Sequence, residues 1–376
     1  MPSVKILHLA DLHIGAAVSG LGTRAESRRA ETLITFERII NLAKTSKVDI
    51  LLIAGDLFNS NRIERSYIDR VFECFALIPE IQIVFAAGNH DPLNLESPFK
   101  TRELPDNLHI LGTEDSFVEF PALSTRVWGK SFKEVYMAGS PRFSLVPDTN
   151  FINIMCIHGE LKADLNSKYN PLTAEFIENC GMDYVALGHV HKRTEITKIG
   201  NTHCAYCGCG EGQGFDELGP KGVYLGEVSK GGCDLQFIPT AKRMHIAENI
   251  DISDVLNSTE IADKVLGILR DKYAENYADN LYKITLTGSV DEQTVINLAE
   301  IEIRLNEFLY FAKVRNNTQL AIDLEILAQE KSLKGIFVKK MLEKLVNADD
   351  EEKQRLTSAL QLGLRAFNTE VAYDED

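Results

Sequence analysis

The sequence has no long hydrophobic run. No stretch reaches the roughly 18 consecutive apolar residues that a membrane-spanning helix requires. The N-terminus passes from Met1-Pro2-Ser3 into a short strand-like segment, without the apolar core of a secretion signal. Of the 376 residues, 44% are hydrophobic and 25% are charged, which is typical of a soluble globular protein. We therefore expect a cytoplasmic protein with no membrane partner.

A disulfide framework is also missing. The 7 cysteines are odd in number and mostly scattered, and Cys74, Cys156 and Cys180 stand in apolar surroundings, as reduced core thiols do. Three others, Cys204, Cys207 and Cys209, share a glycine-rich stretch. They indicate either a zinc knuckle or a simple loop that carries thiols. Because no second Cys-x-x-Cys pair stands at structural-zinc spacing, the loop is the favoured interpretation.

Positive charge is scarce, since the formal net charge is -15 at pH 7. This argues against a protein that holds nucleic acid by itself with a broad basic face. It does not exclude a nuclease whose positive charge comes from metal ions and from a partner subunit, because a bound divalent cation can be the largest local charge in a site.

Apolar runs alternate with amphipathic segments through the first quarter of the chain. Residues 4–9, 49–53 and 81–87 are predicted strands, and residues 24–44 and 64–77 are predicted helices. Such alternation is typical of a parallel α/β sheet, in which ligands collect at the carboxyl ends of the strands. Each of these strands runs into a polar turn.

The middle of the chain is richer in strands. Residues 151–157 and 184–187 are predicted buried strands that again end in polar turns. Further strands at 222–228 and 235–238 are expected to complete a second sheet. From about residue 242 the pattern changes to a compact α+β unit with its own core, in which residues 253–273 and 291–306 are predicted helices and residues 281–287 and 308–315 predicted strands.

Candidate metal ligands stand at the ends of five apolar runs. Oxygen and nitrogen donors of this kind suit a pair of divalent metals, which need about seven ligands with one bridging carboxylate. In the turn after the predicted strand 81–87, a histidine can carry a proton near pH 7, and the aspartate that follows it can hold the imidazole in one orientation. The seven candidate ligands are Asp11, His13, Asp56, Asn89, His158, His189 and His191, and the histidine and aspartate are His90 and Asp91.

Taken in order, the motifs Asp-x-His, Gly-Asp, Gly-Asn-His-Asp, His and Gly-His-x-His resemble the calcineurin-like metallophosphoesterase superfamily. Within it the sequence is most similar to the SbcD-type DNA repair exonucleases, through residues 7–15, 55–58, 184–191 and 210–225. The resemblance implies an α/β fold: a four-layer α/β/β/α metallophosphoesterase sandwich with a small α+β capping domain and a C-terminal helical tail.

The same resemblance implies three parts. Residues 1–240 would be the nuclease domain, and residues 241–330 a capping domain that assists DNA binding. Residues 331–376 would be a helical tail whose two apolar stripes either pack as a bundle edge or dock on a partner. The stripes are Phe337-Met341-Leu345 and Leu356-Leu360-Leu364-Phe367.

By resemblance, each ligand also receives a role. One ion, most readily Mn(II), would be held by the set Asp11, His13, Asp56 and His191, and a second by the set Asp56, Asn89, His158 and His189, with Asp56 bridging. The ions would activate water for in-line attack on phosphorus. His90, steered by Asp91, would stabilise or protonate the leaving oxygen.

One position departs from the family. Many of these nucleases carry a histidine after Gly-Asp-Leu-Phe, where this chain has Asn59. An amide carries neither a proton nor a positive charge at neutral pH. Single-strand cleavage is therefore better supported than duplex exonuclease activity.

The expected function is a dinuclear-metal-dependent DNA exonuclease or endonuclease that acts in repair with an SbcC-type coiled-coil ATPase. Whether the chain also forms a homodimer is left open. A phosphodiesterase or phosphatase for a small phosphorylated metabolite would use the same metal centre. A metal-bound scaffold without catalysis is the third interpretation, against which the complete ligand set weighs.

Overall fold

The computed structural model describes residues 2–18, 21–139, 146–161, 166–290, 294–321 and 323–347, and individual positions between 352 and 367. The chain divides into two compact units. The first comprises Met1–Glu248, Lys272–Lys283 and Phe308–Lys313, and the second comprises Asn249–Asp271, Ile284–Glu307 and Val314–Asp376. Among the helices in these ranges, none is both long enough and apolar enough to cross a membrane.

The first sheet has six strands in the order β12-β11-β1-β2-β3-β4. The four strands from β1 to β4 run parallel, whereas β11 is antiparallel to β1 and β12 is antiparallel to β11. The bounds are β1 (Ser3–Leu9), β2 (Ile50–Ile53), β3 (Gln82–Phe85), β4 (Leu108–Ile110), β11 (Gly222–Ser229) and β12 (Gly232–Pro239).

This arrangement corrects one expectation from the sequence. The strands predicted at 222–228 and 235–238 do not complete the second sheet. They extend the first one, because β11 pairs along its length with β1, from Ser3 opposite Ser229 to His8 opposite Tyr224.

The second sheet also has six strands, in the order β5-β6-β7-β8-β10-β9. Its four central strands are parallel, and the edge strands β5 and β9 are antiparallel to their neighbours. The bounds are β5 (Ser116–Phe120), β6 (Thr125–Lys130), β7 (Ile152–His158), β8 (Tyr184–Gly188), β9 (Thr197–Ile199) and β10 (Thr202–Tyr206).

Alternation along the strands builds the layers. In β1, Val4 and Ile6 face the core between the sheets, whereas Leu7 and Leu9 face the helices on the outer side. Side chains from β7 and β8 alternate in the same way, with Tyr184 directed between the sheets.

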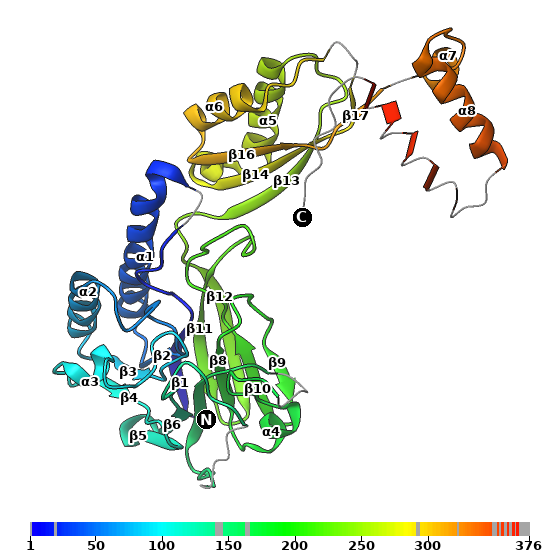
Figure 1. The fold of residues 1–376 in the computed structure, drawn as a ribbon. Coiled ribbons are helices and arrows are strands. Elements are labelled where there is room, and N and C mark those ends of the chain that lie inside the picture. The colour runs from blue at the N-terminus through cyan, green and yellow to red at the C-terminus, as the bar shows by residue number, and fades with distance from the viewer. Residues whose placement is uncertain are drawn as a thin grey trace. The chain divides into compact units, whose positions relative to one another are not determined.

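The helices α1 (Ala25–Thr45) and α2 (Arg65–Ala76) cover the outer face of the first sheet, and α4 (Ala174–Asn179) covers that of the second (Figure 1). The result is the expected four-layer α/β/β/α sandwich. Short helical turns complete this part of the chain: η1 (Gly22–Arg24), α3 (Pro98–Thr101) and η2 (Pro121–Leu123).

After the sandwich, three strands form a sheet in the order β13-β14-β16. The strand β13 was not predicted, and helix α5 begins at Ser258 rather than near residue 253. The helix expected at 291–306 is found as α6, but it begins only at Leu298 and ends at Phe308; residues 294–297 are not helical, and residues 291–293 lie outside the described ones. The bounds are β13 (His245–Asp251), α5 (Ser258–Tyr273), η3 (Ala274–Asp279), β14 (Leu281–Thr287), β15 (Ser289–Val290), α6 (Leu298–Phe308), β16 (Phe311–Asn316) and β17 (Gln319–Leu320).

The C-terminal helices form a small apolar cluster of their own. It contains Leu327 of α7 (Leu324–Leu327), Val338 and Met341 of α8 (Leu333–Asn347), and the later residues Leu360 and Leu364. The two stripes seen in the sequence therefore pack on each other. A different set of apolar side chains on this segment is exposed, by 74% at Leu333, 50% at Ile336 and 80% at Val346.

Candidate metal centre

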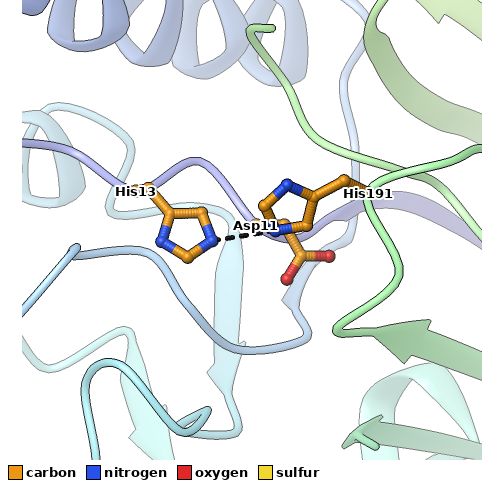
Figure 2. A group of neighbouring side chains, drawn as sticks. All are labelled: Asp11, His13 and His191. Carbon is orange, nitrogen blue, oxygen red and sulfur yellow. Dashed lines mark hydrogen bonds between the residues drawn. The ribbon is translucent and has the colours of Figure 1, made fainter. Parts of the chain in front are cut away.

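The candidate ligands come from the carboxyl ends of parallel strands in both sheets. Loops after β1, β2 and β3 carry four of them, His158 is the last residue of β7, and the loop after β8 carries the remaining two. Ligand atoms of Asp11, His13 and His191 all lie within 4.8 Å of one another, and the same holds for Asp11, Asp56 and His158 (Figure 2 for the first group). The fold thus brings together residues that are up to 180 positions apart.

One half of the site is a pair of facing imidazoles. The Nε2 atoms of His13 and His191 are 3.0 Å apart, as the dashed line in Figure 2 shows. A neutral imidazole has one N–H and one lone pair. Two ring nitrogens that point at each other beside the carboxylate of Asp11 fit a shared cation, to which both could donate a lone pair.

The other half of the site is arranged around an amide oxygen. The Oδ1 of Asn89 lies 3.0 Å from Nε2 of His158 and 3.1 Å from Nδ1 of His189. The opposite nitrogen of His158 faces the carbonyl oxygen of Ala54 at 2.9 Å. A hydrogen placed on that nitrogen leaves the Nε2 lone pair directed into the site.

Asp56 lies between the two halves. Its Oδ2 is 3.6 Å from Nε2 of His13 and 3.4 Å from Nε2 of His158. Its Oδ1 accepts the backbone N–H of His90 at 2.8 Å, which fixes the orientation of the carboxylate. A single buried oxygen thus faces one histidine of each half.

The backbone that presents these ligands is strained. Asp11, His13, Asp56 and His189 all have positive φ angles, of 51°, 48°, 52° and 99°. Side-chain-bearing residues adopt this region at a cost of about 1–3 kcal/mol each, and such residues cluster at functional sites. The loops are held by hydrogen bonds from the N–H of Asp11 to Gly55 at 3.1 Å and from the N–H of His13 to Asp56 at 2.9 Å.

Close approach also requires glycine at the centre. A Cβ at Gly55, whose φ is +87°, would lie 2.4 Å from Nδ1 of His158. A side chain at this position would displace a candidate ligand. The Gly-Asp motif therefore has a steric reason as well as a chemical one.

Burial and mutual charge shape the protonation of the site. Burial raises the pKa of Asp11 to about 7 and lowers the pKa of His13 to about 3. Burial opposes the charge on Asp56 as well, but the neighbouring His158 and His13 bring its pKa below the usual value. Burial would lower the pKa of His158, yet the carboxylate of Asp56 raises it to about 9. Without a metal, a proton on His158 offsets the buried negative charge of Asp56. A bound cation would supply that positive charge instead.

His90 and Asp91 do not pair as expected. Asp91 is fully buried, and its carboxylate accepts the backbone N–H groups of Leu57 at 2.8 Å and Gly88 at 2.8 Å. Nδ1 of the exposed His90 instead faces the carbonyl oxygen of Asn59 at 3.1 Å. Asp91 therefore shapes the loops, and the main chain at Asn59 orients the imidazole.

Sequence reasoning missed two carboxylates that contact candidate ligands. Glu160 lies 3.6 Å from Nε2 of His189, and Glu217 is hydrogen-bonded to Nδ1 of His191. The position of Glu160 directly after His158-Gly159 was a usable signal. Glu217 lies in the stretch 210–225 that resembles the family, but nothing in that stretch links it to His191.

The thiols of the glycine-rich stretch are buried and free. Cys204 and Cys207 are in no group of potential metal ligands among the described residues, whereas Cys209 shares one with His191 and Glu217. No pair of cysteines forms such a group within those ranges, so the structure gives no support to a zinc knuckle.

The donor set fits a pair of divalent cations. It offers carboxylate and amide oxygens together with imidazole nitrogens and no thiolate at its centre, which suits metals such as Mn(II) better than softer ions.

Comparisons with known proteins agree with this geometry. The family described as Calcineurin-like phosphoesterase matches residues 4–193. The uncharacterized metallophosphoesterase YhaO of Bacillus subtilis is 27% identical over 70% of this chain and 67% of its own length. The DNA double-strand break repair protein Mre11 of Methanopyrus kandleri is 29% identical over 61% of this chain and 55% of its own length.

A third relative, a subunit of the nuclease SbcCD from Rhodobacter capsulatus, is 36% identical over 29% of this chain and 27% of its own length. The chain thus spans between about a quarter and two thirds of the length of these three relatives. The family match covers half of this chain, and the strand-end ligands and the sandwich lie within or beside it. The chain therefore belongs to the calcineurin-like phosphoesterase family, a family of hydrolases that use divalent metals.

Proposed function

We propose that this protein is a two-metal phosphodiesterase that cleaves DNA as the nuclease component of a repair complex. The observation that carries the proposal is the position of Asp56, whose Oδ2 lies within 3.6 Å of one histidine from each half of the site. A carboxylate in that place suits a bridge between two cations. With Asp56, one ion would be bound by Asp11, His13 and His191, and the other by Asn89, His158 and His189.

Two divalent ions, when bound, activate water and take up the charge that develops on the phosphate oxygens. The chain's own part is to position and to transfer protons. His90 is exposed, and its Nδ1 is engaged by the carbonyl of Asn59, so its Nε2 is available to the leaving oxygen. Asp91 keeps the loops that carry Asp56 and Asn89 in register.

Two observations favour DNA over a small metabolite. Two of the relatives are named as a DNA break repair protein and as part of a nuclease. In addition, a second compact unit and a helical cluster follow the phosphoesterase sandwich, and a hydrolase for a small molecule has little use for such additions. The net charge of -15 fits a nuclease that obtains positive charge from its ions and from a partner.

The test is cleavage of end-labelled single-stranded and duplex DNA, beside a chromogenic phosphodiester, with Mn(II) supplied. We expect cleavage of DNA, and faster cleavage of single strands than of duplex ends, because Asn59 replaces a histidine. Hydrolysis of the chromogenic substrate without any cleavage of DNA would favour the small-metabolite alternative. No hydrolysis of either substrate would favour the scaffold.

Removal of metal should abolish activity. After exhaustive chelation we expect phosphodiesterase turnover to fall to background, because the ligand atoms alone cannot activate water. Titration of Mn(II) back into the apoprotein should restore the rate, with Mg(II) and Ca(II) as comparison ions. Full activity in the chelated protein would be incompatible with the proposal.

The helical tail is proposed as the docking element for an SbcC-type ATPase. Its cluster buries one apolar stripe of α8, while Leu333, Ile336 and Val346 stay exposed. Amphipathic helices commonly enter a groove of a partner through such a second face. That partner would also supply the DNA-binding charge that this chain lacks.

Deletion of the tail should separate association from catalysis. Because Leu327 of α7 packs in the tail cluster, the cut belongs after Ala321 rather than after Glu330. The truncated protein should keep its melting temperature and its activity on the chromogenic substrate but no longer co-purify with the ATPase.

A double variant, Leu333→Glu with Ile336→Glu, should reproduce the loss of association without removing the cluster. Retained association in both proteins would overturn the assignment of the tail.

A further inference from the structure

The glycine-rich stretch between Cys207 and Glu217 lies against His191. From the sequence, the cysteines of this stretch indicated either a simple loop or a zinc knuckle. Neither interpretation accounts for the contact between the stretch and His191. We propose that Glu217 is a positioning residue for the metal ligand His191 and that the loop exists to hold its carboxylate in place. This inference rests on the proposed metal centre.

The first step of the argument is the contact between the two side chains. Nδ1 of His191 is hydrogen-bonded to Oε1 of Glu217. An ionised carboxylate accepts but cannot donate, so the imidazole hydrogen belongs on Nδ1. The lone pair is then on Nε2, which faces His13 at 3.0 Å, on the side of the proposed ion (Figure 2).

The second step is that the loop restrains the carboxylate. The other oxygen of Glu217, Oε2, accepts the backbone N–H of Gln213 at 2.7 Å and lies 3.6 Å from Sγ of Cys209. With both oxygens engaged, the carboxylate cannot rotate away from the imidazole. Partners of this kind fix the tautomer and the ring orientation of metal-binding histidines.

The third step is that the same segment also forms hydrogen bonds to the main chain of His191. The backbone N–H of Cys209 reaches the carbonyl oxygen of His191 at 3.3 Å, and Nζ of Lys221 reaches it at 3.4 Å. A Cβ at Gly208, whose φ is +74°, would lie 2.8 Å from that same oxygen. Glycine at position 208 therefore permits the close approach of the loop to the carbonyl oxygen of His191.

A direct metal site is the competing interpretation. Ligand atoms of His191, Cys209 and Glu217 lie within 4.8 Å of one another. The hydrogen bond between the imidazole and the carboxylate already accounts for two of these three atoms. A third ion at this place would require Cys209 as a ligand, and this difference can be measured.

The experiment compares Glu217→Ala with Glu217→Gln by Mn(II) titration of the apoprotein, followed by calorimetry and metal analysis. The alanine variant should bind the ion at Asp11, His13 and His191 about 10–100-fold more weakly, as is usual when the partner of a ligand is removed. Its affinity for the other ion should not change. The glutamine variant should lose less, because its amide oxygen can accept the same hydrogen. Glu195→Gln, with a carboxylate side chain that is 81% exposed, is the matched control and should match the wild type.

Nitrogen-15 spectra of the wild-type apoprotein supply a readout that needs no variant at Glu217 and no activity. His191, assigned by loss of its signals in His191→Asn, should carry its hydrogen on Nδ1 at a pH where its imidazole is neutral. A neutral imidazole with its hydrogen on Nε2, unchanged affinities in Glu217→Ala, or equal weakening of both ions would overturn the positioning role.

A third ion in the wild type that disappears in Cys209→Ala would overturn it in favour of a direct site. Wild-type protein that binds no ions would overturn the metal centre and this inference together, whereas normal loading with a wrong tautomer would overturn this inference alone.

Discussion

Replacing Asp56 with asparagine should lower phosphodiesterase turnover by about 10³-fold or more. The substitution removes a carboxylate charge that lies between the two halves of the site, where Oδ2 is 3.6 Å from Nε2 of His13 and 3.4 Å from Nε2 of His158. Loss of about 4 kcal/mol of metal-based stabilisation of the transition state corresponds to a factor of that size. Steady-state hydrolysis of a chromogenic phosphodiester with saturating Mn(II) measures it.

Metal analysis of the same variant adds a second readout. We expect fewer than two ions per chain in Asp56→Asn, because its weakened oxygen serves both ions. The exposed Asp106 provides a matched control, and Asp106→Asn should behave as the wild type. Two tightly bound ions and near-normal turnover in Asp56→Asn would show that Asp56 does not bridge.

Replacing His90 with alanine should lower turnover on DNA by about 100-fold or more while two ions stay bound, which is the usual size of a general-acid contribution. The imidazole is exposed and is oriented by the carbonyl of Asn59, and this contact leaves Nε2 for the leaving oxygen. Turnover of a nitrophenyl phosphodiester, whose leaving group needs no proton, should fall much less than turnover of DNA. The half-buried His109, which pairs with Gln82, supplies the control His109→Ala.

The alternative for His90 is a ligand role. Ligand atoms of His13, Asp56 and His90 also lie within 4.8 Å of one another. If metal analysis of His90→Ala shows that one ion is lost, or if both substrates slow equally, His90 acts through the metal and not as an acid.

The parts of the fold that follow from local patterns were predictable. The strands that become β1, β2, β3, β7 and β8 are apolar runs that break at polar turns, and parallel strands bring such turns to one edge. The pairing of β11 with β1 was not predictable, because a ladder between segments more than 200 residues apart leaves no trace in either one.

The same limit applies to the candidate site. The residues expected to bind metal were visible because each follows an apolar run, and the structure brings them together. The partners of those residues were not visible. Glu217 is 26 positions from His191, and Asn59 contributes a main-chain carbonyl whose role any residue type could fill. Asp91 reads as a partner for its neighbour His90 until the structure shows it bound to amides of another loop.

Anomalous diffraction from crystals of the Mn(II)-loaded protein tests the central claim most directly. We predict two peaks, one bounded by Asp11, His13 and His191 and the other by Asn89, His158 and His189, with the carboxylate of Asp56 between them. A single peak, or peaks outside this group of side chains, would contradict the two-metal centre.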